Sequence, residues 1–428
     1  MDVPDSIDLR RPPRPRAWPH ALLPARLDSI AHPTPFLICD GATLERRYED
    51  LCDLLPGVRL YYAVKSNPMP QVVDTLARRG CGFEIASIYE LDMVTAAGVD
   101  PADVLFSNTV KPAAHIAEAA RAGLYRFAFD SEGELRKLAA AAPGSSVYVR
   151  LRVDDEHSVF PLSRKFGTTA DDAVRLLVLA RRLGLVPYGI TFHVGSQCSD
   201  AGAWERAIDR TGAVLAGVAA EGIRLEMLDL GGGIPARYVA PVPTLASIAA
   251  AIERGLRRLP YRPRHLCAEP GRSLVAESGV MAATVIGVET RGDERWAYLD
   301  VGGYNGMMEP VQTGGRWPFP LLTSRPGGCS SGAVPGDWVA DPRELAAGAK
   351  VRTTVTGPSC DSSDTMFYGV LLPASLATGD RLYIGSAGAY TTSYASSFNG
   401  FPPPATLFLD RRGRLRPPAP AVPLRIGA

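Results

Sequence analysis

Apolar and polar residues follow one repeating pattern between residue 60 and about residue 275. Short runs rich in Val, Ile, Leu, Phe and Tyr alternate with longer segments in which apolar residues recur at helical spacing. The predicted strands span residues 60–65, 82–86, 103–107, 125–129, 146–152, 186–193, 225–230 and 264–268. The helices predicted between them include residues 70–79, 88–97, 113–122, 131–141, 171–183 and 202–221. This order of strand–helix units predicts an α/β fold, a TIM-like (β/α)8 barrel.

After residue 275 the pattern becomes that of a β-rich domain with Gly and Pro between its strands. Strands are predicted at residues 275–289, 296–301, 351–355, 381–384 and 406–409, and a strand at 35–39 could join them. We therefore expect a second, C-terminal domain that is a β sandwich or barrel. The expected divisions are a Pro/Arg-rich segment at 1–34, a barrel at 42–275, the β-rich domain at 35–41 plus 276–410, and a Pro-rich tail at 411–428. Residues 322–347 form a Gly/Pro/Ser-rich stretch long enough to predict a functional lid or a poorly ordered loop.

Composition narrows the class of protein. The chain has 428 residues, of which 46% are hydrophobic and 21% charged, and these values favour a soluble globular protein with a sizeable core. The net charge of +1 gives no electrostatic reason to expect a nucleic-acid or membrane partner. No apolar run could span a bilayer, and no apolar segment of a signal peptide follows the Arg-rich residues 10–16. Seven scattered cysteines without a CxxC pair favour reduced thiols in the cytoplasm, and neither a disulfide framework nor a metal site is expected.

Lys65 stands where the first predicted barrel strand runs into the turn Ser66–Pro68. Burying an ammonium group at the end of an apolar strand costs several kcal/mol unless the charge is paired or neutralised. A lysine with a lowered pKa can form a Schiff base with a carbonyl group, which is the functional interpretation. The alternative is a lysine whose side chain extends to water at the strand end.

Other chemically useful residues follow the later strands, at the end of a barrel where active sites lie. Three glycines, Gly231–Gly233, would allow backbone N–H groups to approach an anion, although they could also form a tight turn without a ligand. Glu269 could keep a pyridine nitrogen protonated, or it could pair with an arginine such as Arg272. His193 could stack on a planar ring, or it could be a satisfied core histidine.

A lysine, a phosphate-binding turn, a carboxylate and a histidine together describe a site for pyridoxal 5′-phosphate (PLP). Nine motifs between residues 36 and 402 support this interpretation: Tyr62–Asn67, Phe129–Ser131, Lys165–Gly167, Phe192–Ser196, Leu230–Gly233, Ala268–Arg272, Gly357–Asp361, Gly388–Thr391 and Phe398–Phe401. In kind and order they resemble the fold-type III PLP-dependent decarboxylases. That family holds the ornithine, lysine, arginine and diaminopimelate decarboxylases, and the resemblance is closest to the ornithine branch.

The resemblance implies a role for each matching residue. Lys65 would form the Schiff base, His193 would stack on the cofactor ring, and Glu269 would pair with the ring nitrogen. Cys360 would protonate the α-carbon and Asp361 would face the far end of the substrate. The residues expected to bind the cofactor are Lys65, His193, Ser196, Gly232, Gly233, Glu269, Gly271, Arg272 and Tyr390. In the family the loop that carries the Cys-Asp pair reaches the active site of the other subunit, which implies an obligate homodimer with shared sites.

The chain departs from the ornithine pattern at two places. Residues 303–317 contain no aspartate, although ornithine-type enzymes usually carry one there for the distal amine. Asp361 would then meet a cationic group, with Glu309 as a second candidate for that contact, and Arg152 is a further substrate-binding candidate. The family's Phe-Asp-Cys-Ala-Ser is also altered here, to Phe83–Ser87.

The expected reaction is therefore decarboxylation of an L-amino acid to an amine and CO2, with an ornithine- or lysine-like diamino acid as the first choice of substrate. An N-modified diamino acid such as a citryl conjugate, or diaminopimelate, is the alternative, in polyamine, siderophore or natural-product biosynthesis. An amino-acid racemase would need an opposing tyrosine base that nothing in the sequence marks. A non-catalytic regulator would typically lose the cofactor residues that this chain keeps.

Overall fold

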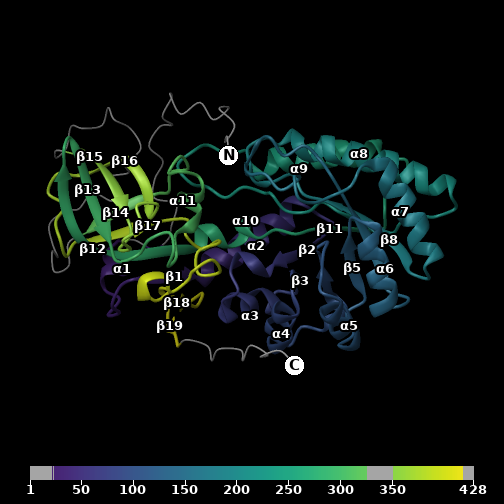
Figure 1. The fold of residues 1–428 in the computed structure, drawn as a ribbon, viewed down its shortest axis with the longest axis horizontal. Coiled ribbons are helices and arrows are strands. Elements are labelled where there is room, and N and C mark those ends of the chain that lie inside the picture. The colour runs from purple at the N-terminus through teal and green to yellow at the C-terminus, as the bar shows by residue number, and fades with distance from the viewer. Residues whose placement is uncertain (1–21, 23, 325–349, 418–428) are drawn as a thin grey trace. The chain divides into compact units, whose positions relative to one another are not determined.

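The computed structural model describes residue 22, residues 24–324 and residues 350–417. These residues form two compact units. Figure 1 draws them with a colour that runs from purple at the N-terminus to yellow at the C-terminus. The barrel unit comprises residues 47–235 and 242–272. The β-rich unit comprises the described residues up to 46, residues 236–241, and the described residues from 273 to 417.

The barrel unit contains a closed barrel of parallel strands in the order β10-β11-β2-β3-β4-β5-β6-β8. Its strands are β2 (Val58–Ala63), β3 (Gly82–Ile85), β4 (Val104–Phe106), β5 (Arg126–Phe129), β6 (Ser146–Leu151), β8 (Val186–Phe192), β10 (Met227–Asp229) and β11 (His265–Ala268). Each lies within or close to a strand predicted from the apolar pattern. The short strands β7 (Ser158–Phe160) and β9 (Ser196–Cys198) pair with each other beside the barrel. The predicted fold class, a TIM-like barrel with a separate β-rich domain, is confirmed.

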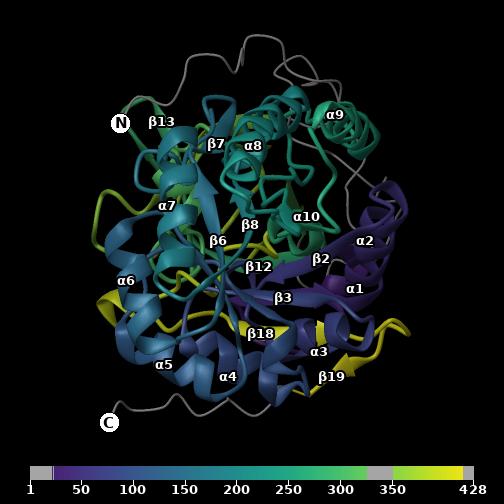
Figure 2. The ribbon, with the colours of Figure 1, turned by 90° about the vertical axis from the view of Figure 1, so that its right-hand side faces the viewer.

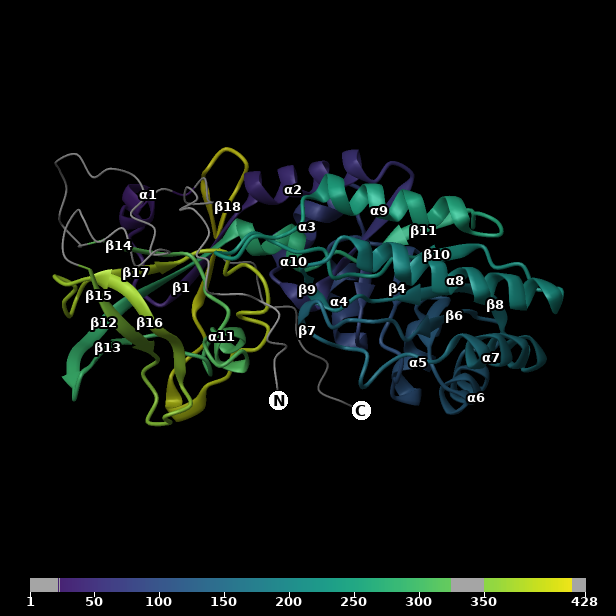
Figure 3. The ribbon, with the colours of Figure 1, turned by 90° about the horizontal axis from the view of Figure 1, so that it is seen from above.

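Helices surround the barrel strands, as the view in Figure 2 shows. They are α2 (Gly41–Leu54), α3 (Pro70–Arg78), α4 (Ile88–Ala96), α5 (Ala113–Arg121), α6 (Glu132–Ala141), α7 (Ala170–Arg182), α8 (Gly202–Ala220), α9 (Leu245–Arg258) and α10 (Arg272–Val275). Four of them begin at a Ser or Thr whose hydroxyl accepts a backbone N–H of the first turn: Ser87, Ser131, Thr169 and Thr244. Helices α8 and α9 lie side by side (Figure 3). Two 3-10 turns, η1 (Val64–Ser66) and η2 (Pro101–Asp103), also belong to this unit.

Side chains fill the inside of the barrel. A buried cluster joins residues of six strands: Tyr61, Leu105, Ala128, Tyr148, Met227 and Cys267. The guanidinium of Arg126 is buried beside this cluster and donates to the Tyr61 hydroxyl at 3.0 Å. The interior is thus a packed core, and chemistry is left to the residues at the strand ends.

The β-rich unit is built on one sheet with the strand order β16-β15-β13-β12-β1-β18-β19, and β17 pairs with both β12 and β14. The strands are β1 (Phe36–Asp40), β12 (Gly279–Arg291), β13 (Glu294–Leu299), β14 (Leu321–Ser324), β15 (Lys350–Thr356), β16 (Thr365–Pro373), β17 (Arg381–Ile384), β18 (Ala405–Leu409) and β19 (Leu415–Arg416). Strand β1 is antiparallel to β12 and parallel to β18. Short helical segments complete the unit: α1 (Pro24–Asp28), α11 (Met308–Gln312), η3 (Ala276–Ser278) and η4 (Phe398–Gly400).

Three segments singled out in the sequence fall partly outside the described residues. Of the loop predicted at 322–347, residues 322–324 belong to strand β14 and the rest is outside. The start of the N-terminal segment and residues 418–428 of the tail are outside as well. Within the described part of the chain, every helix is too short or too polar to cross a bilayer.

Candidate active site

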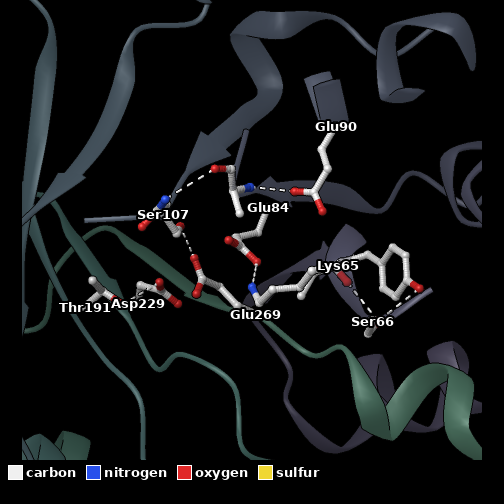
Figure 4. Close-up of polar contacts among 12 residues, drawn as sticks. Lys65, Ser66, Glu84, Glu90, Ser107, Thr191, Asp229 and Glu269 are labelled. Atoms are coloured by element: carbon white, nitrogen blue, oxygen red, sulfur yellow. Dashed lines mark hydrogen bonds and ion pairs between the residues drawn. The ribbon is translucent and has the colours of Figure 1, made fainter. Parts of the chain in front are cut away.

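Lys65 lies just beyond the end of strand β2, in the turn η1. The Ser66 hydroxyl donates to the carbonyl oxygen of Ala63 at 2.8 Å and holds this turn together. The Lys65 Nζ atom forms an ion pair with the Glu84 Oε2 atom (Figure 4). The Lys65 side chain is 44% exposed, whereas that of Glu84 is 2% exposed. The strand ends at Ala63 and water reaches the Lys65 side chain, so the buried member of this ion pair is Glu84.

Strand register explains how Glu84 comes to lie beside Lys65. Strands β2 and β3 are parallel, and Ala63 is paired with Glu84 across them. Lys65 follows Ala63 by two residues, so the Glu84 carboxylate lies at the same end of the barrel as Lys65. Sequence reasoning noted that the stretch around Glu84 departs from the family pattern, but it assigned Glu84 no role.

A second carboxyl group, that of Glu90, lies close behind Glu84. Ser87 caps helix α4 by accepting the Glu90 backbone N–H at 3.3 Å, and the Glu90 Oε2 atom accepts the Ala86 backbone N–H at 2.6 Å. This pair is a variant of the capping box, because Glu90 accepts from the residue before the N-cap rather than from the N-cap Ser87 itself. Burial raises the pKa of Glu90 to about 7, and the negative charge of Glu84 acts in the same direction. Two carboxyl groups, those of Glu84 and Glu90, thus lie close to Lys65.

Glu269 follows strand β11 and is 9% exposed. Its Oε1 atom accepts a hydrogen bond from the Ser107 hydroxyl (Figure 4). The Ser107 hydroxyl oxygen also lies 2.8 Å from the hydroxyl of buried Tyr148. Burial raises the pKa of Glu269 well above its ordinary value, and the charges of Asp229 and Glu84 raise it further. Burial and these neighbouring charges therefore favour the protonated form of the Glu269 carboxyl group.

Asp229 ends strand β10 and is completely buried. Its Oδ2 atom accepts from the Thr191 hydroxyl at 2.7 Å and its Oδ1 atom accepts from the Gly231 backbone N–H at 2.9 Å. Burial raises the pKa of Asp229 to about 6 despite these two donors. Asp229 therefore fixes the turn after β10 and places a titrating group beside Glu269.

His193 follows strand β8, and the Gly195 backbone N–H donates to its Nδ1 atom at 3.0 Å. Burial lowers the pKa of His193 well below its usual value, and the positive charges of Arg150 and Lys65 lower it further. The ring is therefore neutral, with Nδ1 as the acceptor. A Cβ atom at Gly232 would lie 2.8 Å from the His193 Nε2 atom, so a glycine at this position leaves room for the ring.

The other two glycines of the turn have a packing reason of their own. Gly231 and Gly233 have φ angles of +63° and +102°, which favour glycine. A Cβ atom at Gly231 would lie 1.8 Å from the Phe192 carbonyl oxygen, and one at Gly233 would lie 2.6 Å from the Gly195 carbonyl oxygen. The sequence left two interpretations of these glycines open, the approach of an anion and a tight turn without a ligand. That approach stays a prediction, and close packing against the turn after β8 is an additional requirement.

Arg272 and Ser196 are brought together by the fold. Arg272 is 4% exposed, and its Nε atom donates to the Ser196 hydroxyl oxygen at 3.2 Å. The Arg272 guanidinium carbon lies 5.4 Å from the centre of the Phe160 ring. A Cβ atom at Gly271 would lie 3.0 Å from the Ser66 Cβ atom, so the chain after β11 passes close to the Lys65 turn. A buried cation with a hydroxyl beside it can bind an anion.

Arg150 is a further basic residue of this strand end, and the sequence analysis gave it no role. Its guanidinium carbon lies 5.1 Å from the centre of the Phe166 ring. Burial lowers the pKa of Arg150, while the charges of Glu269, Asp130 and Glu84 oppose that shift. Arg152, which the sequence favoured as a substrate-binding residue, is exposed and donates to the Gly167 carbonyl oxygen at 3.3 Å.

The remaining predicted residues belong to the β-rich unit. Cys360 is exposed and Asp361 beside it is partly exposed. The Asp361 carboxylate accepts the Ser363 backbone N–H at 2.8 Å and the Tyr304 hydroxyl at 2.7 Å. These two donors, the Ser363 backbone first, lower the pKa of Asp361. Asp361 is therefore a carboxylate that stays charged.

Glu309 and Tyr390 are the other two predicted residues of the β-rich unit. Glu309 is 4% exposed, in the first turn of helix α11. Tyr390 has a φ angle of +54°, and its ring is stacked with that of Tyr394 at a centroid distance of 5.9 Å. Both stay predictions, Glu309 as a substrate-binding residue and Tyr390 as a phosphate-binding residue.

The donor set of the barrel unit fits PLP. A primary amine at Lys65 can attach to an aldehyde, a neutral imidazole at His193 offers a flat face, and the Glu269 carboxyl group can pair with a pyridine nitrogen. The buried guanidinium of Arg272 and the hydroxyl of Ser196 are suited to a phosphate group. All of these groups lie at the ends of neighbouring barrel strands.

Comparison with known proteins gives the family. The model of the family described as "pyridoxal-dependent decarboxylase, pyridoxal binding domain" matches residues 41–276. The lysine/ornithine decarboxylase of Selenomonas ruminantium is 33% identical over 370 residues, which cover 86% of this chain and 88% of that protein.

Solved structures agree with this assignment. A Vibrio vulnificus lysine/ornithine decarboxylase complexed with cadaverine is 30% identical with a TM-score of 0.77, and the match covers 90% of this chain and 96% of that one. The arginine decarboxylase of the Paramecium bursaria Chlorella virus is 28% identical with a TM-score of 0.79, over 89% and 98% of the two chains. Other matching structures were solved in complex with PLP.

These matches confirm the expected PLP cofactor and the expected class of enzyme. The family model covers more than half of the chain, and the bacterial relative extends over most of its length. The chain belongs to the pyridoxal-dependent decarboxylases.

Proposed function

We propose that this protein removes the α-carboxyl group of an L-diamino acid of the ornithine or lysine type and releases an amine and CO2. The observation that carries the substrate class is Asp361, a carboxylate that stays charged beside the exposed thiol of Cys360. A fixed, partly exposed carboxylate is suited to recognising the distal ammonium of a diamino acid. The substrates named for the relatives, lysine, ornithine and arginine, all carry a distal cation and support the proposal.

Each barrel residue then has a task. Lys65 would hold PLP through its Nζ atom, and Glu84 would orient that atom through its ion pair. The phosphate would be held by Ser196, Gly232, Gly233, Gly271 and Arg272, together with Tyr390 of the β-rich unit. When bound, PLP supplies a conjugated electron sink for the electrons of the bond that breaks at the α-carbon.

Glu269 and His193 would set the electronic surroundings of the cofactor ring. The Glu269 carboxyl group can pair with the ring nitrogen, and burial and neighbouring carboxylates favour its protonated form. The neutral His193 ring can lie against a pyridine without adding a positive charge. Arg150, close enough to lower the pKa of His193, adds a positive potential at the same barrel end.

The β-rich unit would complete the reaction. The Cys360 thiol would donate the proton that replaces the lost carboxyl group on the α-carbon, and Asp361 would hold the far end of the substrate. We further propose a cytoplasmic homodimer in which the Cys360–Asp361 loop of one subunit serves the active site of its partner. The resemblance to the decarboxylases supports the dimer, and the free thiols of the described cysteines agree with a reducing compartment.

A screen for CO2 release tests the proposal. The purified protein with PLP is given carboxyl-labelled L-ornithine, L-lysine, L-arginine, meso-diaminopimelate and citryl conjugates of the diamino acids. We expect release from at least one of the first three with a kcat on the order of 10 per second, which is typical of enzymes. Release from a citryl conjugate or from diaminopimelate alone would reassign the substrate. Loss of optical rotation without CO2 would indicate a racemase.

A further inference from the structure

Asn399 belongs to the motif Phe398–Phe401, to which neither the sequence nor the proposed reaction gave a task. We propose that Asn399 is the positioning residue of Cys360: its side-chain amide holds the thiol in the orientation from which it donates a proton. The inference rests on the proposed role of Cys360 as the proton donor to the α-carbon.

The contact is made twice by one atom. The Asn399 Oδ1 atom accepts the Cys360 backbone N–H at 3.1 Å and lies 3.3 Å from the Cys360 Sγ atom. An amide oxygen can only accept, so the thiol donates in this contact and keeps its hydrogen. The hydrogen bond from the backbone N–H holds the main chain of Cys360 in place, and the hydrogen bond from the thiol favours one side-chain rotamer. The position of the Cys360 sulfur therefore depends on Asn399 in both respects.

Local backbone conformation explains why an asparagine stands there. Asn399 has a φ angle of +54°, and Gly400 after it has a φ angle of +79°. Among residues with a side chain, Asn is one of the few that adopts this left-handed region readily, because its short amide can hydrogen-bond locally. Gly would satisfy the backbone at this position, but only Asn or Asp also supplies an oxygen to Cys360.

The segment 396–400 that carries Asn399 is itself anchored. The Ser396 backbone N–H donates to the Tyr304 carbonyl oxygen at 2.8 Å, and the Tyr304 and Phe398 rings lie 4.5 Å apart. The Tyr304 hydroxyl donates to Asp361 at 2.7 Å. The segment therefore holds Cys360 through Asn399 and reaches Asp361 through Tyr304, so the thiol and the carboxylate have a fixed relation to each other.

Fixed geometry matters for the proposed proton transfer. A general acid accelerates a reaction only when its proton lies within hydrogen-bond reach of the atom that receives it. A misplacement on the order of 1 Å can reduce the rate by about 100-fold. Removing the amide should thus weaken the chemical step and leave substrate binding largely unchanged.

The first test measures the contact itself in the full-length holoenzyme. Cys360 alkylation by iodoacetamide is followed by peptide mass spectrometry in wild type, Asn399→Gly and the matched control Ser397→Gly. Asn399→Gly keeps the left-handed backbone and removes the acceptor, so Cys360 should react about 3- to 10-fold faster, as expected for loss of one modest hydrogen bond. Ser397→Gly, an exposed change in the same segment, should react at the wild-type rate. An unchanged rate in Asn399→Gly would overturn the proposal.

The second test asks whether Asn399 acts through Cys360. Asn399→Gly should lower kcat by about 10- to 100-fold with little change in KM, and Asn399→Asp, which keeps an acceptor oxygen, should retain more of the rate. In a Cys360→Ala background, Asn399→Gly should cause no further loss of kcat, because Asn399 then has no thiol to position. An equal loss in both backgrounds would overturn the proposal. If the wild-type protein releases no CO2 from any substrate, the proposed function fails, and the alkylation rates still decide the Asn399–Cys360 contact.

Discussion

The ammonium of Lys65 forms an ion pair with the carboxylate of Glu84, and it is the carboxylate that is buried. Water reaches the lysine at the barrel end, whereas Glu84, a residue of strand β3, has 2% of its side chain exposed. A buried charge whose counter-ion is removed is costly. Lys65 therefore contributes to the stability of the barrel as well as offering an amine for the cofactor.

Lys65→Ala should lower the stability of the protein without PLP. The change leaves Glu84 buried without this counter-ion, and we expect the free energy of unfolding to fall by about 1–3 kcal/mol, less than for a fully buried pair because water can approach from the Lys65 side. In Lys65→Ala/Glu84→Gln the unpaired charge is gone, and most of the loss should be recovered. Urea unfolding of the four proteins of this cycle measures the effect. A double variant no more stable than Lys65→Ala would contradict the ion-pair interpretation.

Glu90 should make stability fall as pH rises. Its pKa is raised to about 7 in the folded protein, so the folded state binds the Glu90 proton more tightly than the unfolded state does. Below about pH 4.5 Glu90 is protonated in both the folded and the unfolded state, and its burial costs no stability. As the pH rises from about 4.5 to about 7, the unfolded state loses this proton first, and the free energy of unfolding falls. Glu90→Gln cannot lose a proton, so above pH 7 it should be more stable than wild type by an amount on the order of 2 kcal/mol.

Urea midpoints at pH 5 and pH 8 check this expectation. Glu132→Gln is the matched control, because hydrogen bonds from Arg136 lower the pKa of exposed Glu132. Above pH 4.5, Glu132→Gln should be slightly less stable than wild type, whereas Glu90→Gln should be more stable. A Glu90→Gln advantage that is equal at both pH values would show that titration is not its cause.

Gly232→Ala should weaken the binding of PLP. The new Cβ atom would lie 2.8 Å from the His193 Nε2 atom and 2.9 Å from the Glu269 carbonyl oxygen, so the imidazole must move. Overpacking of this kind costs about 1–3 kcal/mol, which corresponds to roughly a tenfold or greater rise in the Kd for PLP. Gly133→Ala, on helix α6 where a Cβ would meet no atom within 4 Å, should leave the Kd unchanged. Titration of the apoprotein with PLP distinguishes the two variants.

Mixing two inactive variants tests the proposed sharing of sites. Lys65→Ala and Cys360→Ala should each abolish most activity alone. If a site takes Lys65 from one subunit and Cys360 from its partner, random exchange makes roughly half of the dimers mixed, each with one intact site, and restores roughly a quarter of the wild-type activity. A mixture that stays inactive after subunit exchange has been verified would place both residues of a site in the same subunit.

The barrel could be predicted from the sequence because its strands and helices have distinct periods. Strands such as β6 (Ser146–Leu151) and helices such as α7 (Ala170–Arg182) carry their pattern within a few residues. Strand β16 (Thr365–Pro373) was missed: Gly369 in its middle has a φ angle of +61°, and the register to β15 shifts near it. Such an irregularity breaks the pattern on which a strand prediction depends.

The residues of the site were predicted from motifs, but their partners were not. The pairing of Lys65 with Glu84 depends on the register of β2 against β3, and the neighbourhood of Asp229 depends on that of β10 against β8. The spacing of residues along the chain does not tell which residues of two strands are paired. The strand was also predicted to run to Lys65, because an apolar pattern does not reveal that the strand ends at Ala63.

The central claim, that Lys65 holds the cofactor of this decarboxylase, is tested most directly by trapping. The purified protein with PLP is reduced with borohydride, digested, and examined by peptide mass spectrometry. We predict loss of the visible absorbance band and a phosphopyridoxyl group on the peptide that contains Lys65, with no label in Lys65→Ala. Label on another lysine, or a wild-type protein that takes up no PLP, would contradict the account.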